Sequence, residues 1–205
     1  HESQSLLVEM QVCRSREFLF YAAPRMRAAF GAEGEAWDVD NLHRLYTRVE
    51  PGFIRVDADE VTYPAHIILR YRLERALVAG DLALGDLPGA WADGMRELLG
   101  VVPPDDRLGC LQDIHWPSGA FGYFPTYTMG AAAAAQLFAA ARRDAPGITE
   151  AIARGEFSPL MTWLRTHVHG QGARLSAAEL LKRVTGESLN PAIFRGHLET
   201  RYLSS

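Results

Sequence analysis

The sequence predicts an all-α protein with at most one small β element, and three observations support this fold class. Apolar residues recur at helical spacing along most of the 205 residues. Glycines, prolines and capping residues stand where those helical stretches would begin or end. Only residues 53–56, after a Pro–Gly turn, form a short apolar stretch of the length expected for a strand or an extended edge.

The first predicted element is a helix over residues 3–30, in which apolar side chains recur at helical spacing. Pro24 is expected to kink or restart this helix, because proline lacks the backbone N–H that a helix interior needs. A loop follows, and a second helix is expected over about residues 38–49, with an aspartate as its cap.

A long helix comes after the extended segment, capped by Asp57 or Asp59 and broken at Gly80. Its apolar positions recur every three to four residues, which predicts one buried face. The residues expected on that inner face are Val61, Ala65, Ile68, Leu69, Arg72 and Ala76.

The rest of the chain is predicted to be helical except for a loop over residues 109–118. A helix that starts at Pro88 precedes this loop, with proline at its favoured first position. A helix over residues 121–143 follows, and its alanine-rich second half predicts close packing by its neighbours. Ser176 and Glu179 match a capping box. Four shorter helices complete the fold, near residues 148–154, 157–168, 176–185 and 191–202.

Composition and charge narrow the function classes. The net charge of −4 disfavours general nucleic-acid binding, and no apolar run reaches membrane-spanning length. Cys13 and Cys110 lie far apart without metal-binding or redox spacing, which suits a reducing compartment. We therefore expect a cytoplasmic protein without a signal peptide and with neither nucleic-acid nor membrane partners. Because the chain starts at His1, inside a motif, we also expect it to be a fragment of a longer protein.

Polar residues that could carry chemistry gather in three clusters, the first of which is His-Glu-Ser-Gln at residues 1–4. A zinc-binding H-E-x-x-H helix would place a second histidine where Ser5 stands. The cluster is therefore an incomplete zinc motif, or a surface helix start at which Glu2 stabilises the helix dipole. By itself the pattern favours the surface helix start.

The second cluster is Ile-Arg-Val-Asp-Ala-Asp at residues 54–59. Its arginine, Arg55, stands in the short extended segment just ahead of the long helix. A planar guanidinium is well suited to hold a carboxylate of a ligand bidentately. The alternative is an intramolecular ion pair with Asp57 or Asp59, and by itself the pattern favours that pair.

The third cluster is the richest in polar and aromatic residues and runs from position 109 to position 127. Such a mixture in a loop that opens a helix indicates a pocket wall. The alternative, which the residues support equally, is a helix hairpin with a core of aromatic side chains and a buried, hydrogen-bonded His115. The residues concerned are Gln112, Asp113, His115, Trp116 and, four apart on one helical face, Tyr123 and Tyr127.

Taken together and in order, the three clusters resemble the motifs of the carboxypeptidase Taq (M32-type) family of metallocarboxypeptidases. Residues 1–4 are similar to that family's His-Glu-Ser segment, which follows its H-E-x-x-H helix and supplies the third metal ligand. Residues 54–59 match its I-R-x-x-A-D motif, and residues 109–116 match its G-x-x-Q-D-x-H-W motif. The H-E-x-x-H segment itself does not occur in this sequence.

The resemblance implies a fold and an activity. Residues 1–205 would be the C-terminal, mostly helical part of a zincin-like metallopeptidase catalytic domain that lacks the upstream H-E-x-x-H segment. The whole enzyme would be a cytoplasmic homodimer that uses zinc or cobalt to release single C-terminal amino acids from peptide substrates with broad specificity. This chain alone would hold no tightly bound metal and would be inactive.

The resemblance also implies roles for individual residues. Glu2 would be the carboxylate ligand of the metal. Arg55 would anchor the terminal carboxylate of the substrate. His115 and either Tyr123 or Tyr127 would be the catalytic hydrogen-bond donors. The other substrate-binding residues would be Gln112, Asp113 and Trp116.

Two other function classes remain open. One is a non-catalytic helical module, used in dimerisation or regulation and derived from such an enzyme. The other is a nucleic-acid binder that uses the helices near the C-terminus, whose spacing loosely suggests a helix-turn-helix. The negative net charge disfavours this second class.

Overall fold

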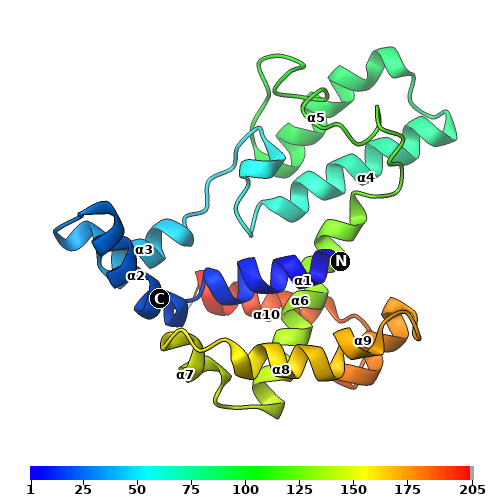
Figure 1. Cartoon of the computed structure of the whole chain (residues 1–205). Helices are drawn as coiled ribbons and strands as arrows, with labels where there is room; N and C mark the ends of the chain where they lie inside the picture. Colours follow the sequence, from blue (N-terminus) through cyan, green and yellow to red (C-terminus); the bar gives the residue numbers. More distant parts are fainter. Residues whose placement is uncertain (204–205) are drawn as a thin grey trace. The chain divides into compact units, whose positions relative to one another are not determined.

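The computed structural model describes residues 1–203, and the regular structure in that range is helical, without a strand (Figure 1). The predicted all-α class is therefore confirmed. Residues 53–56 do not form the possible β element: Ile54 is extended, but Arg55–Asp57 close a single 3₁₀ turn, η3. The α-helices are α1 (Glu2–Leu6), α2 (Arg16–Phe30), α3 (Val39–Tyr46), α4 (Tyr63–Ala79), α5 (Leu87–Leu99), α6 (Pro125–Asp144), α7 (Ile148–Ala153), α8 (Ser158–His167), α9 (Ala177–Thr185) and α10 (Pro191–Tyr202).

The chain is organised as two compact units. We call His1–Thr47 with Gly130–Ser205 the terminal unit, and Arg48–Met129 the central unit. Among the described residues, the helices are too short or too polar to span a lipid bilayer.

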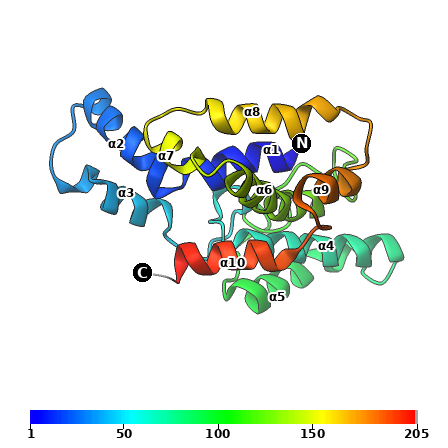
Figure 2. The same cartoon turned by 90° about the horizontal axis from the view of Figure 1, so that it is seen from below.

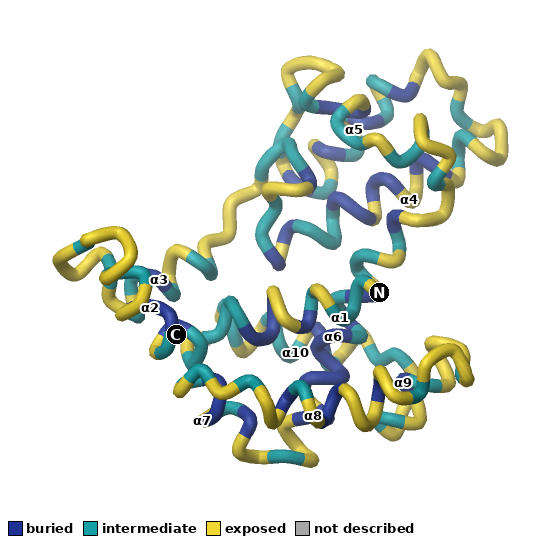
Figure 3. The backbone as a smooth tube through the Cα atoms, in the orientation of Figure 1, coloured by how far each residue is buried: buried dark blue, intermediate teal, exposed yellow. Residues whose placement is uncertain are grey.

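The terminal unit is built around α6, which Figure 3 shows buried along most of its length. Figure 2 shows α1 and α6 between α8 and α10. Ala134 of α6 packs with Leu160 and Leu164 of α8, and Ala132 of α6 packs with Phe194 of α10. Small alanine side chains let these helices approach closely, so the expected close packing of the alanine-rich segment is confirmed.

The N-terminal helical stretch differs from the prediction in where it breaks. After α1 the chain continues as a π-helix, η1 (Leu7–Cys13), and α2 begins after Ser15. The Ser15 hydroxyl accepts the backbone N–H of Phe18 at 3.1 Å and donates to the carbonyl oxygen of Val12 at 2.7 Å. Pro24 lies inside α2, so the helix does not restart at Pro24; it restarts after the cap at Ser15.

The C-terminal helix α10 holds the π-helix through polar contacts. Arg201 donates from Nη1 to the carbonyl oxygen of Met10 at 2.6 Å. One turn earlier on α10, the Nε2 atom of His197 lies 3.2 Å from the amide nitrogen of the buried Gln11. The capping box at Ser176 and Glu179, which opens α9 nearby in sequence, is confirmed.

The core of the central unit lies between α4 and α5, where Leu69 and Leu73 pack with Trp91 and Met95. The inner face predicted for α4 is partly wrong, because Ile68 is 41% exposed and Arg72 pairs with Glu97 at the surface. The residues that α4 buries are His66, Ile67, Leu69, Arg70, Leu73 and Glu74. Half of this set is polar, so a pattern of apolar residues could not locate the face.

Candidate functional site

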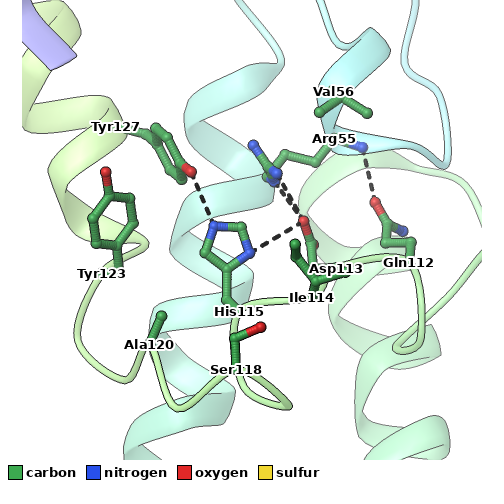
Figure 4. Close-up of a pocket in the computed structure, with 10 residues that line it drawn as sticks. All are labelled: Arg55, Val56, Gln112, Asp113, Ile114, His115, Ser118, Ala120, Tyr123 and Tyr127. Carbon is green, nitrogen blue, oxygen red and sulfur yellow. Dashed lines mark hydrogen bonds and ion pairs between the residues drawn. The ribbon is translucent and has the colours of Figure 1, made fainter.

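A pocket of about 520 Å³ lies in the central unit, against the segment that connects α5 to α6 (Figure 4). This segment, residues 100–124, contains turns but neither helix nor strand. The pocket is lined by Arg55, Val56, Gln112, Asp113, Ile114, His115, Ser118, Ala120, Tyr123 and Tyr127. Six of the predicted site residues therefore lie around one cavity.

Asp113 joins two arginines at the base of the pocket. Its Oδ1 accepts from Nε and Nη2 of Arg55, at 3.0 and 2.7 Å, and its Oδ2 accepts from Nε of Arg70 at 2.6 Å. Burial alone would raise the pKa of the Asp113 carboxyl, but the charge of Arg70 and the bonds from both arginines outweigh burial and lower that pKa. Asp113 is therefore ionised at neutral pH.

The arginines carry more charge than Asp113 can neutralise. The side chain of Arg70 is fully buried, and burial lowers its pKa to about 10, which still leaves it charged at neutral pH. For Arg55, burial is the largest single effect and opposes the charged form, but hydrogen bonds and charge interactions with Asp113 and Tyr63 together outweigh burial and raise the pKa. Two guanidinium groups around one carboxylate leave a net positive charge at this end of the pocket.

The sequence pattern favoured an ion pair of Arg55 with Asp57 or Asp59, but the structure pairs Arg55 with a different carboxylate. Its partner is Asp113, 58 residues further along the chain. Asp59 instead accepts the backbone N–H groups of Val61 and Thr62, both at 2.9 Å, and so fixes the turn that leads into α4. Arg55 also donates from Nη1 to the hydroxyl of Tyr63 at 2.7 Å.

Gln112 fixes the segment against its surroundings. Its Oε1 accepts the backbone N–H of Arg55 at 2.9 Å and Nη2 of Arg70 at 2.8 Å. Its Nε2 lies within hydrogen-bond distance of the carbonyl oxygens of Phe53, at 3.0 Å, and Leu108, also at 3.0 Å. These contacts join η3 and the segment 100–124 into one wall of the pocket.

His115 and Tyr127 form a hydrogen-bonded pair in the pocket, with 2.9 Å between Nε2 and the hydroxyl oxygen. The Nδ1 of His115 lies 3.7 Å from Oδ1 of Asp113. Burial lowers the pKa of His115; Asp113 opposes this effect and the two arginines add to it. His115 is therefore neutral at neutral pH. The Tyr123 ring packs against both, 5.9 Å from the His115 ring and 5.3 Å from the Tyr127 ring.

Trp116 faces away from the pocket, into the apolar core of the central unit. Its ring meets that of Trp91 edge to face, with centroids 6.5 Å apart, and its Nε1 donates to Glu74 at 2.6 Å. The structure thus places Trp116 behind the pocket wall rather than among the residues that line it in the described chain.

Glu2 belongs to the terminal unit, where α1 crosses α6 closely. A Cβ atom added at Gly130 would lie 2.6 Å from Cβ of Glu2, so the crossing at this point requires glycine. Catalytic zinc sites take about three protein ligands. Within residues 1–203, His, Cys, Asp and Glu side chains form no group of three or more that could hold a metal ion. The residues of this range therefore do not make up a whole metal site.

Three residues that contact the site were missed in the sequence: Tyr63, Arg70 and Glu74, all on α4. Tyr63 receives a hydrogen bond from Arg55, and Arg70 pairs with Asp113. One signal could have found two of them. His66, Arg70 and Glu74 are spaced four apart, so three polar residues share one face of a helix that is otherwise apolar toward its neighbours.

Fold and site together define an all-α protein with a cationic pocket that also holds a histidine–tyrosine pair. The family described as Carboxypeptidase Taq (M32) metallopeptidase matches residues 1–202, and the chain belongs to that family. The resemblance drawn from the three motifs is thereby confirmed.

Named relatives agree with this assignment. The chain is 45% identical to thermostable carboxypeptidase 1 of Thermus thermophilus over 202 residues, which cover 98% of this chain and 39% of that protein. It is 38% identical to carboxypeptidase 1 of Bacillus subtilis, covering 98% of this chain and 40% of that protein. The solved structure of Trypanosoma cruzi metallocarboxypeptidase 1 superposes with a TM-score of 0.94 and 42% identity, over 99% of this chain and 42% of the other. The chain spans about two-fifths of the length of the curated relatives it matches.

Proposed function

We propose that this chain is part of a metal-dependent carboxypeptidase that releases single C-terminal amino acids from peptides, with broad specificity. The observation that carries the proposal is the positive end of the pocket, where Arg55 and Arg70 share one carboxylate. The family membership of the chain supports the reaction class.

Arg55 is the residue we assign to the terminal carboxylate of the peptide. A guanidinium has five N–H donors, and the bonds of Arg55 to Asp113 and Tyr63 use donors on Nε, Nη1 and Nη2. A second carboxylate at this place would neutralise the excess positive charge and form charge-assisted hydrogen bonds. Internal peptide bonds carry no such charge, so this anchor would favour chain ends.

His115 and Tyr123 are the donors we assign to the reacting end of the substrate. Preorganised donors stabilise charge that develops on a carbonyl oxygen during hydrolysis. Tyr127 holds Nε2 of His115 through its hydroxyl, so we assign it to orienting the imidazole. Tyr123 is 39% exposed and lines the pocket, which suits contact with a substrate.

Glu2 is the residue we assign to the metal, as one carboxylate ligand. Zinc or cobalt would polarise the peptide carbonyl and activate water when bound. In the family the two histidine ligands and the base come from an H-E-x-x-H segment, which the printed sequence does not contain. We therefore propose that the isolated chain hydrolyses nothing and holds no metal tightly.

A reducing, cytoplasmic setting and a homodimeric whole enzyme complete the proposal. Both cysteines are free thiols: Cys110 is buried and Cys13 half-buried. Burial raises the pKa of each thiol, which keeps both in the unreactive protonated form at neutral pH.

The carboxylate anchor can be tested in a protein that carries this chain together with an H-E-x-x-H segment, which we call the extended protein. We expect Arg55→Ala to lower kcat/KM by about two to four powers of ten on peptides with a free C-terminus, because a buried charge pair is lost. Peptides amidated at the C-terminus already lack the charge and should lose far less.

The matched control for this experiment is Arg72→Ala, which removes a surface arginine from α4 that pairs with Glu97. This variant should leave kcat/KM unchanged on both free and amidated peptides. Equal losses on free and amidated peptides with Arg55→Ala would show that Arg55 only supports the fold around Asp113.

A further inference from the structure

The segment 100–124 depends on side-chain contacts for its shape, because it lacks helix and strand. Toward its N-terminal side, Arg70 of α4 holds Gln112 and Asp113. One helical turn further on, Glu74 holds two later points of the same segment. Its Oε2 accepts from Nε1 of Trp116 at 2.6 Å, and its Oε1 accepts the backbone N–H of Gly122.

The two points that Glu74 holds are each adjacent to a pocket residue. Trp116 directly follows His115, and Gly122 directly precedes Tyr123. Gly122 has a φ of 75°, in the left-handed region that favours glycine, so the chain turns at the residue whose N–H Glu74 receives. One carboxylate therefore ties together both ends of the turn that separates His115 from Tyr123.

We propose that Glu74 is a positioning residue of the active site: by holding Trp116 and Gly122, it sets where His115 and Tyr123 lie in the pocket. Glu74 is 8% exposed, and each of its two oxygens accepts a hydrogen bond from the segment that it holds. The effect of Glu74 on catalysis rests on the proposed function. Its effect on the placement of His115 can be measured even if the proposed function is wrong.

The chemistry of the contact explains why a carboxylate is required. Both partners are N–H donors, so the side chain must offer two acceptor oxygens at once. Glutamine has the same shape but only one oxygen, so Glu74→Gln leaves one of the two donors facing an NH₂ group. Aspartate keeps both oxygens on a shorter side chain, so Glu74→Asp should restore part of the lost function.

Glu74 also acts on His115 through its charge. The charged groups that influence His115 are Asp113, Arg55, Arg70 and Glu74, and the two carboxylates raise the pKa of His115 against burial and the arginines. Removing the charge of Glu74 should lower the pKa of His115 further. A residue that anchored the segment without being near the imidazole would not have this effect.

The first experiment is an NMR titration of the 205-residue chain and its Glu74→Gln variant. Trp116→Phe identifies the indole N–H signal of Trp116 among the four tryptophans. We expect this signal to move upfield in Glu74→Gln and the pKa of His115 to fall. The matched control is Glu97→Gln, an exposed glutamate on α5, which should change neither.

The second experiment measures kcat and KM in the extended protein. Because Arg55 and Asp113 are held independently of Glu74, we expect Glu74→Gln to lower kcat about ten- to a hundredfold, as for a misplaced catalytic group, and to change KM by less than about twofold. Glu74→Asp should recover part of kcat.

Unchanged kcat in a folded Glu74→Gln variant, or equal effects on kcat and KM, would overturn the proposal, as would an unchanged pKa of His115. If the wild-type extended protein releases no C-terminal residues while the NMR shifts appear, the proposed function fails and the placement of His115 by Glu74 stands.

Discussion

His66 is a fully buried histidine of α4 whose two ring nitrogens have no hydrogen-bond partner among residues 1–203. Burial, together with the charges of Arg70 and Arg55, lowers its pKa from 6.5 to about 4. Between these values the unfolded chain binds a proton at this position that the folded chain does not. The free energy of unfolding therefore rises as the pH increases from about 4 to 6.5, and it decreases again as the pH falls through this range.

We predict that this residue accounts for about 3 kcal/mol of the stability lost between pH 6.5 and pH 4, since each pKa unit corresponds to about 1.4 kcal/mol. His66→Phe should remove that part of the pH dependence. It should not lower stability near neutral pH, because it replaces two unpaired buried nitrogens with carbon. Denaturant unfolding at a series of pH values measures both effects.

The control for the titration of His66 is His169→Gln, which changes an exposed histidine. This variant should keep the pH dependence of the wild type. Carboxylates also titrate in the same range, but wild type and variants share them, so the difference between the curves isolates His66. Identical slopes for His66→Phe and wild type would show that His66 is protonated in the folded chain.

At the level of single residues, the sequence predicted most of the residues that line the pocket but not the α4 residues that hold them in place. Arg55, Asp113 and His115 stand in polar clusters, and such clusters in loops indicate sites. Arg70 and Glu74 are charged residues within a helix, and such residues usually face solvent. The charge that compensates the buried Arg70 is a carboxylate 43 residues away, and a pairing over that distance leaves no local pattern.

Among the elements, the prediction located the helices better than the points where they break. Proline disfavours a helix interior, yet α2 continues through Pro24. The actual break is at Ser15, whose hydroxyl both receives an N–H group of α2 and donates to the preceding π-helix. The contribution of a cap depends on the geometry of the chain before it, which the sequence pattern does not contain.

The cap gives a second prediction about stability. Ser15→Ala should lower the free energy of unfolding by about 1 kcal/mol, because it leaves the N–H of Phe18 without its acceptor. Ser15→Asp retains an acceptor and should cost only a few tenths of a kcal/mol. Chemical denaturation of the two variants beside wild type checks this, and equal losses in both would show that the hydroxyl's bond to Val12 is the important one.

At the scale of the whole molecule, the fold class was predictable and the division into two units was not. Helical periodicity and caps run through the entire chain, so the all-α class follows from local pattern. One boundary between the units falls at residues 129 and 130, within the continuous helix α6. A boundary inside a helix has no linker composition, and sequence analysis finds domains by their linkers.

The last prediction concerns the isolated 205-residue chain. We expect it to fold, because each unit has its own buried apolar cluster, and to associate into dimers or larger species. We expect no hydrolysis of an N-blocked dipeptide with added zinc or cobalt, because Glu2 is the one metal ligand that we assign. Turnover that a chelator removes and that Glu2→Ala abolishes would show that the active site has been assigned wrongly.

The π-helix after α1 has a consequence for changes in chain length. A π-helix of seven residues, Leu7–Cys13, accommodates an extra residue that an α-helix would not. Each residue of an α-helix turns the chain by about 100°. Deleting one residue between Leu7 and Cys13 would therefore restore an ordinary α-helix and rotate Glu2 away from Gly130. We therefore expect a one-residue deletion in this stretch to disturb the crossing of α1 and α6 more than a deletion in a surface loop.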